Sequence, residues 1–110
     1  MKKKTIKIPS LDSKVFVYIG DESSCANRTE KDGYEWSDYQ AAVTIKFGIN
    51  AEIVFDEEQI KPEYIYHEAL HAAWYILEIK GVSADYDNQE SLAYLQGYIA
   101  TEILKIVLNK

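Results

Sequence analysis

The chain contains a single cysteine, Cys25, and this scarcity limits both its covalent and its metal chemistry. One cysteine cannot form an intrachain disulfide. A closed structural zinc site usually takes four Cys or His ligands, whereas the whole sequence holds only three such residues, Cys25, His67 and His71. Any zinc bound by this chain must therefore also use a carboxylate or water. Cys25 lies in a polar stretch outside any spaced ligand pair, so we assign it no chemistry.

Basic residues and long apolar runs are also scarce. The chain has 12 Lys and Arg against 18 Asp and Glu, a net charge of -6. Phosphate contacts need a basic face, so we expect no nucleic-acid partner. No apolar stretch has transmembrane length, and the lysines at residues 2–4 precede no continuous apolar run of the signal-peptide kind. We therefore expect no membrane partner and a cytoplasmic location.

The length and composition predict one domain over residues 1–110. A chain of 110 residues with 47% hydrophobic and 13% aromatic residues has enough apolar material for a single core. Apolar and polar residues alternate in the first half, residues 1–56, which predicts short strands over residues 6–8, 15–19, 43–47 and 51–56. The last two strands form a hairpin. The polar residues 21–38 predict a long loop.

The sequence after residue 60 predicts two helices. Pro62 suits the first position of a helix over residues 61–80, and Lys80-Gly81 is a favourable stop. A second helix is predicted over residues 87–108, because its apolar residues are spaced to form one buried stripe: Leu92, Leu95, Ile99, Ile103, Ile106 and Val107. Asp87 is a suitable N-cap for this helix. The expected fold class is α+β, with a mostly antiparallel N-terminal sheet followed by the two helices.

Both histidines lie on the first expected helix, in the sequence His67-Glu68-Ala69-Leu70-His71, an HExxH motif. Helix residues four apart have Cβ atoms about 5–6 Å from each other, so both imidazoles can reach one metal ion. Glu68 lies beside that ion. The motif therefore predicts two zinc ligands and a general base, the minimum for activating water on zinc.

The alternative is a chance motif, with two ordinary half-buried histidines and a solvated Glu68. Against this, the helical face shared by Tyr64, His67 and His71 adjoins apolar residues such as Ile65. We favour the metal interpretation for that reason.

A hydrolytic zinc site needs a third protein ligand and one open position. Glu90 is the candidate, because 18 residues separate it from His71 and it falls in the first turn of the second helix. Two antiparallel helices joined by a short loop can face each other. Glu90 also fits a capping box beginning at Asp87, in which it would bond to the N-cap amide. We expect the ligand role, with Asp85 and Asp87 as alternative ligands.

HExxH followed by 18 residues and a glutamate resembles the pattern of gluzincin metallopeptidases, a branch of the zincins, over roughly residues 51–100. The resemblance implies a small zincin-like domain. In it, Zn²⁺ is bound by His67, His71 and Glu90, and the general base is Glu68. Short proteins of bacteriophages and other bacterial mobile elements also look similar, with an HEALH-like helix followed by a helix similar to residues 90–95.

The resemblance also implies where a peptide or protein substrate binds. Zincins place a strand before the active-site helix, and residues 51–56 match that strand, whose exposed edge pairs with an extended substrate. The chain departs from thermolysin-like members, which carry an aspartate where Tyr94 stands. Residues 48–52 do not match the GxMEN motif of the aminopeptidase branch, so exopeptidase activity is not implied.

The expected mechanism is metal-assisted hydrolysis. Zinc lowers the pKa of its bound water to about 7, Glu68 takes the proton, and the hydroxide attacks a polarised peptide carbonyl. Glu68 then delivers the proton to the leaving amine. For the oxyanion donor we expect Tyr94 first and Tyr86 second, while ordinary aromatic packing is the competing interpretation for either.

The sequence leaves three function classes open. The first is a small zinc metallopeptidase, and the second is a zincin-shaped binding module in which the metal holds the helices together. The third is a metal-free α+β domain with an accidental motif. Glu68 favours the enzyme, because a structural zinc site has no use for a base beside an open coordination position.

Overall fold

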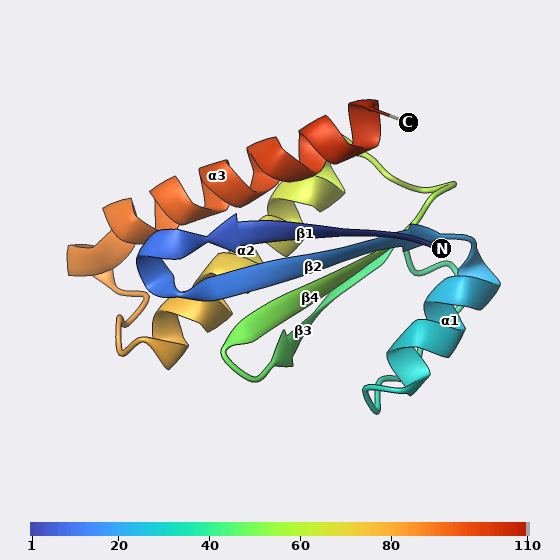
Figure 1. Ribbon diagram of the computed structural model, residues 1–110, viewed down its shortest axis with the longest axis horizontal. Helices are drawn as coiled ribbons and strands as arrows, with labels where there is room; N and C mark the ends of the chain where they lie inside the picture. The colour runs from blue at the N-terminus through green and yellow to red at the C-terminus, as the bar shows by residue number, and fades with distance from the viewer. Residues whose placement is uncertain (110) are drawn as a thin grey trace.

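Four strands form one mixed sheet with helices on both faces in the computed structural model, which describes residues 1–109 (Figure 1). Short 3-10 turns occupy Pro9–Leu11 and Tyr86–Asn88. The elements in chain order are β1 (Lys2–Ile8), β2 (Ser13–Gly20), α1 (Glu22–Glu30), β3 (Ala42–Phe47), β4 (Asn50–Asp56), α2 (Pro62–Ile79) and α3 (Gln89–Leu108). The predicted α+β class is confirmed. Within residues 1–109, none of the helices is both long enough and apolar enough to cross a bilayer.

The sheet order is β1-β2-β4-β3. The β1/β2 and β3/β4 pairs are antiparallel, whereas β2 and β4 run parallel, with Val15 opposite Ala51. Gly48 closes the β3–β4 hairpin with a left-handed φ of 62°, which glycine adopts without steric cost. Because β4 is paired on both sides, the expectation that residues 51–56 present an exposed edge is wrong. The edge strand beside β4 is β3.

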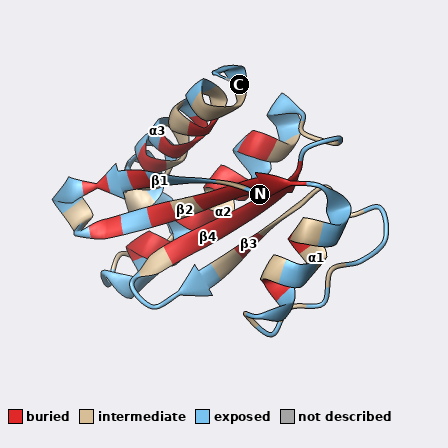
Figure 2. Ribbon diagram, turned by 45° about the vertical axis from the view of Figure 1, so that its right-hand side comes forward, coloured by how far each residue is buried: buried red, intermediate tan, exposed pale blue. Residues whose placement is uncertain are grey.

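The main core lies between the sheet and the helices α2 and α3. Alternate side chains of the two central strands point to these helices, and those side chains are Val15, Val17, Ile19, Ala51, Ile53 and Phe55. From the helices, the core takes residues such as Ile65, Ala69, Ile76, Ile99 and Ile103. Figure 2 shows the buried residues running along β2 and β4, with the outer strands more exposed.

The other face of the sheet carries α1, in the segment that was predicted as a loop. That prediction is wrong for its first part, because Asp21 caps a helix by accepting a hydrogen bond from the Ser24 amide at 2.8 Å. Cys25 and Thr29, four residues apart, face inward and are fully buried. Two small inward-facing residues are a weak periodic signal in a polar segment, so the hydrophobic pattern does not reveal the helix.

The ends of α2 and α3 follow the predictions to different degrees. At the end of α2 the Gly81 amide donates to the Glu78 carbonyl and the Val82 amide to the Leu77 carbonyl, the two bonds of a Schellman motif. The predicted stop is thus confirmed. α3 begins at Gln89, two residues later than predicted, and Asp87 is not its cap.

Candidate metal centre

The HExxH motif sits on α2, and the packing of this helix decides which way the histidines point. The side chains buried against the core are Ile65, Ala69, Ala72, Ala73, Ile76 and Leu77, at three- and four-residue spacing. This spacing fixes the rotation of the helix about its axis. His67 and His71 are therefore held on the outer side of α2, and the side chain of His67 is 65% exposed.

The two imidazoles converge through the same ring nitrogen. Nε2 of His67 lies 3.2 Å from Nε2 of His71, and the ring centroids are 4.8 Å apart. Two nitrogens that bind one zinc ion at 2.0–2.1 Å with tetrahedral angles lie about 3.3 Å apart. The pair is therefore spaced as two ligands of one ion. The donor set also suits zinc, because neutral imidazole is among its usual ligands.

Glu68 lies between the histidine pair and the edge strand β3. Its Oε2 atom is 3.9 Å from Nε2 of His67, and its Oε1 atom accepts a hydrogen bond from Oγ1 of Thr44 at 2.8 Å. The side chain of Glu68 is 10% exposed. The carboxylate is therefore largely withdrawn from bulk solvent, with one oxygen anchored and the other directed to the histidine side.

A small cavity opens beside this carboxylate. It has a volume of about 250 Å³ and is lined by Ala41, Ala42, Tyr64, His67 and Glu68. The two alanines keep one wall short, and Tyr64 comes from the first turn of α2. A ligand group seated here would contact both Glu68 and one of the histidines.

The edge strand β3 and the helix α2 run side by side beyond this cavity. Thr44 meets Glu68, and further along the strand Nζ of Lys46 lies 3.1 Å from Oε1 of Glu78. The same ammonium lies 5.2 Å from the centre of the Tyr75 ring, which in turn packs beside His71 at 6.2 Å. The ion pair is exposed and adds little stability. The contact does show, however, that β3 lies alongside the part of α2 that carries the two histidines.

Glu90, the expected third ligand, is not brought to the histidine pair. In the described part of the chain, no third His, Cys, Asp or Glu joins His67 and His71 in a group that could hold a metal ion. α3 meets α2 through Gln96, whose amide donates to the carbonyl of Tyr66 at 3.0 Å. Glu90 precedes Gln96 by six residues and so lies about 120° around α3 from that contact. Its side chain is exposed.

The alternative ligands Asp85 and Asp87 do not join the histidine pair either. Oδ1 of Asp85 accepts hydrogen bonds from the backbone amides of Asp87 and Asn88 at 3.1 and 3.2 Å. Asp85 thereby caps the 3-10 turn that precedes α3, whereas Asp87 was predicted to cap the helix itself. Asp87 itself is exposed. Over residues 1–109, no hydrogen bond connects Glu90 to Asp87, so the predicted capping box does not form.

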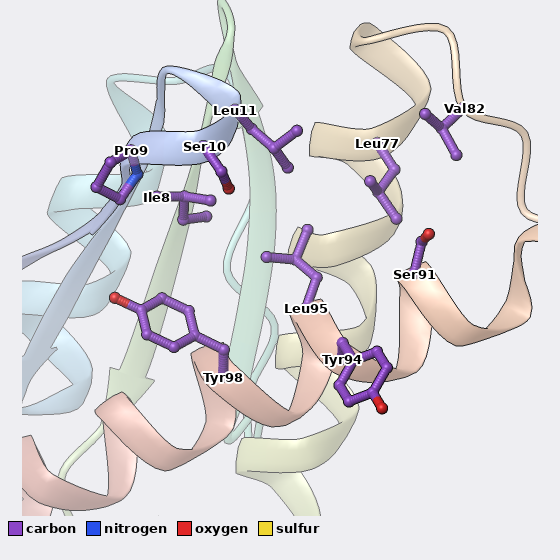
Figure 3. Close-up of a pocket in the computed structure, with 10 residues that line it drawn as sticks. All are labelled: Ile8, Pro9, Ser10, Leu11, Leu77, Val82, Ser91, Tyr94, Leu95 and Tyr98. Carbon is purple, nitrogen blue, oxygen red and sulfur yellow. The ribbon is translucent and has the colours of Figure 1, made fainter.

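The two tyrosines expected to stabilise an oxyanion lie away from the motif. Tyr86 is 84% exposed in the 3-10 turn, and Tyr94 is 75% exposed. Tyr94 lies at the margin of a larger apolar groove of about 660 Å³, between the Pro9–Leu11 turn, the end of α2 and the start of α3, with its hydroxyl turned away from Leu77 (Figure 3). The tyrosine that lines the cavity beside Glu68 is Tyr64.

Sequence reasoning missed Thr44 and Tyr64. The alternation of apolar and polar residues over 43–47 predicted a strand but gave no role to Thr44. In the structure the even-numbered positions of β3 face α2, whereas Val43 packs with the cluster under α1. Tyr64 could have been found from the sequence, because it precedes His67 by one helical turn and so lies on the same face of the helix.

A second group of titratable side chains lies on the opposite face of the sheet, under α1. Oε1 of Glu52 is 2.5 Å from Nε of Arg28, and its other oxygen is buried without a partner. Burial raises the pKa of the Glu52 carboxyl, and Asp32 adds to the rise while Arg28 opposes it. Burial also raises the pKa of the Cys25 thiol to about 12, with a smaller contribution from Asp56. These groups face away from the histidines.

Comparison with known proteins identifies no relative. No protein-family description, no curated protein and no solved structure matches the chain. The arguments for function therefore come from the geometry around His67, Glu68 and His71 and from the motif itself.

Proposed function

We propose that this protein is a small zinc-dependent peptidase of the cytoplasm, with His67 and His71 as zinc ligands and Glu68 as the general base. The observation that carries the proposal is the 3.2 Å separation of the two Nε2 atoms. Support comes from Glu68, whose free oxygen lies 3.9 Å from the first of these nitrogens. The gluzincin-like spacing of the sequence supports the same reaction class.

Glu68 carries the proton transfers of the proposed reaction. When bound, zinc supplies a Lewis acid for the peptide carbonyl and an acidified water. Glu68 takes the proton from that water through Oε2 and passes it to the leaving amine. The low exposure of the Glu68 side chain keeps bulk water away, which strengthens electrostatic interactions with the reacting groups. Tyr64, which lines the same cavity, is the proposed oxyanion donor in place of Tyr94.

Glu90 remains the proposed third ligand, which requires the first turn of α3 to change conformation when zinc binds. The register of the two helices is favourable: Glu90 lies about 9 Å along α3 from Gln96, and His71 lies about 7.5 Å along α2 from Tyr66. Since Gln96 contacts Tyr66, Glu90 and His71 stand at nearly the same level along the helix pair.

The proposed substrate is an extended peptide that pairs with the free edge of β3. Main-chain hydrogen bonds to an edge strand give affinity without sequence preference, and pockets for side chains give specificity. The cavity lined by Ala41, Ala42 and Tyr64 is mostly apolar and lies beside Glu68. A residue next to the scissile bond would therefore place an apolar side chain in it. This moves the proposed substrate strand from residues 51–56 to β3.

Metal analysis and cleavage of a peptide library by three proteins test the proposal. We expect the wild type to bind one zinc ion and to cleave. Glu68→Gln keeps the zinc but loses cleavage, because it removes the base and leaves both histidines in place. Glu90→Ala loses most of its zinc. Cleavage that survives in Glu68→Gln rejects the assignment of the base, and unchanged zinc in Glu90→Ala removes Glu90 from the ligand set.

A binding module without catalysis is the second candidate, and one observation favours it. Glu68 is buried and hydrogen-bonded to Thr44, as a purely structural glutamate would be. In that case the wild type binds zinc and captures extended peptides along β3, and neither the wild type nor any variant cleaves them.

A further inference from the structure

Thr44 is a buried polar residue in the middle of the edge strand β3, and it is 9% exposed. Its side chain faces α2, on the sheet side where the neighbouring strand places Ile53. A hydroxyl in such a position needs a hydrogen-bond partner. Its partner is Glu68, the general base of the proposed peptidase.

The hydroxyl of Thr44 contacts Glu68 at two atoms. Oγ1 lies 2.8 Å from the carboxylate oxygen Oε1 and 3.1 Å from the backbone carbonyl oxygen of the same residue. A hydroxyl has one proton to donate, and the shorter contact is to the charged acceptor, where the bond is stronger. The backbone carbonyl lies within α2, where the helix already provides it with an amide donor.

This bond restricts the conformation of the carboxylate. With Oε1 held by β3, rotation of the carboxylate is restricted, and Oε2 lies on the side of His67, at 3.9 Å from Nε2. Without the bond, Glu68 would keep several rotamers, and the buried Oε1 would lack a partner. Among the described residues, Thr44 is the only one that donates a hydrogen bond to the Glu68 side chain.

We infer that Thr44 is a positioning residue: it holds the Glu68 carboxylate in the orientation that general-base chemistry requires. The inference rests on the proposed peptidase activity for its kinetic consequence. The edge strand then has two roles at once, since its free edge receives the substrate and its inner face aligns the base. Substrate and base are thereby held by the same six-residue strand, Ala42–Phe47.

Two substitutions separate the hydroxyl from the shape of the side chain. Thr44→Val keeps the branched shape and removes the donor, whereas Thr44→Ser keeps the donor and removes one methyl group. Thr29→Val is the matched control, because Thr29 is also fully buried and bonds through Oγ1 to the Cys25 carbonyl, but on the opposite face of the sheet. A merely structural role of the Thr44 hydroxyl predicts losses of stability alone.

The kinetic test uses the zinc-loaded full chain and the library peptide that the wild type cleaves best. In Thr44→Val we expect kcat to fall about 10- to 100-fold, with KM and zinc content within about twofold of the wild type, because a displaced base slows chemistry without weakening binding. Thr44→Ser recovers most of kcat, and Thr29→Val leaves it unchanged. An unchanged kcat in Thr44→Val, or an equal fall in Thr44→Ser, overturns the inference.

A second readout does not depend on cleavage. Three-bond couplings measured by NMR report the χ1 and χ2 rotamers of Glu68, which together place its carboxylate, in the metal-free and zinc-loaded proteins. We expect one rotamer in the wild type and Thr44→Ser, and rotamer averaging in Thr44→Val. A single unchanged rotamer in folded Thr44→Val overturns the inference even if the kinetics change. A wild type that binds zinc but cleaves nothing rejects the peptidase, while the rotamers still decide whether Thr44 fixes the carboxylate.

Discussion

Nε2 of His67 and Nε2 of His71 face each other at 3.2 Å across one turn of α2. Each nitrogen carries a lone pair or a proton, and two neutral rings fit at this distance only when one donates to the other. A metal ion between them satisfies both lone pairs at once. The arrangement depends on the burial of Ile65, Ala69 and Ile76, which fixes the rotation of the helix.

Zinc should stabilise the folded protein through this pair. A ligand that binds only the folded state raises the free energy of unfolding by about 2.7 kcal/mol at 100 times its Kd. For a domain of this size that corresponds to a Tm increase of about 10 °C, measurable by calorimetry with and without zinc. His71→Ala should lose the increase, and a chelator should reverse it. Glu78→Gln, an exposed change on the same helix, is the control. An equal Tm increase in His71→Ala contradicts the assignment.

The overall fold was largely predictable because most elements carry strong periodic signals. β2 and β4 are rich in β-branched and apolar residues, and α2 has a proline start and is followed by a glycine stop. Strand order was not predictable in the same way. Local patterns specify that residues 43–47 and 51–56 form a hairpin, but they do not specify that β2 pairs with β4 and leaves β3 at the edge.

The candidate site was predictable where its residues share one helix and not where they come from several elements. His67, Glu68 and His71 have a fixed mutual geometry because α2 imposes it. Thr44 reaches Glu68 only through the register of β3, and Glu90 depends on the rotation of α3 about its axis. That rotation is set by the packing of residues such as Leu95 and Ile99 against the core, which a spacing of 18 residues does not determine.

The cavity beside Glu68 should control which residue is accepted next to the scissile bond. Ala41→Leu adds three carbons to its lining, so we expect preference to move from larger apolar residues to glycine and alanine, with about a tenfold loss of kcat/KM for the original peptide. Cleavage-site profiling by mass spectrometry measures the change. Ala42 is a poorer choice, because it also packs against the core.

Tyr64→Leu is the counterpart of Ala41→Leu, because it enlarges the cavity. The substitution removes the hydroxyl and part of the ring, so its profile should broaden to larger side chains and its kcat should fall if the hydroxyl stabilises the oxyanion. Identical cleavage profiles for the wild type and Ala41→Leu would show that the substrate side chain binds elsewhere.

Cys25 should be almost unreactive in the folded protein. The buried thiol has its pKa raised from about 9 to about 12, so at pH 8 its thiolate fraction is about 1,000-fold lower than in the unfolded chain. Alkylation by iodoacetamide, followed by mass spectrometry, should therefore be at least that much slower in buffer than in denaturant. The double variant Cys25→Ser/Ser23→Cys moves the thiol to an exposed position of α1 and should react rapidly. Fast alkylation of native wild type would show that α1 opens readily.

The pH dependence of stability should contain a contribution from Glu52 on the sheet face under α1. Burial raises the pKa of this carboxyl above its unfolded value of about 4.5, so the folded state holds the proton more tightly than the unfolded state. The resulting stabilisation is fully present below pH 4.5 and is lost as the pH rises through the folded pKa. Urea denaturation between pH 4 and pH 8 measures it as the difference between the wild type and Glu52→Gln.

The sign of this difference follows from the linkage. The free energy of unfolding of the wild type should fall relative to that of Glu52→Gln as the pH rises above 4.5, and the difference should level off once Glu52 is ionised in both states. Arg28 stays charged throughout the range, and its pair with the ionised Glu52 opposes the effect of burial, so it makes this slope smaller without reversing its sign. Glu58→Gln, an exposed change just after the end of β4, is the control. Parallel curves for wild type and Glu52→Gln would mean that Arg28 compensates the burial of the carboxylate completely.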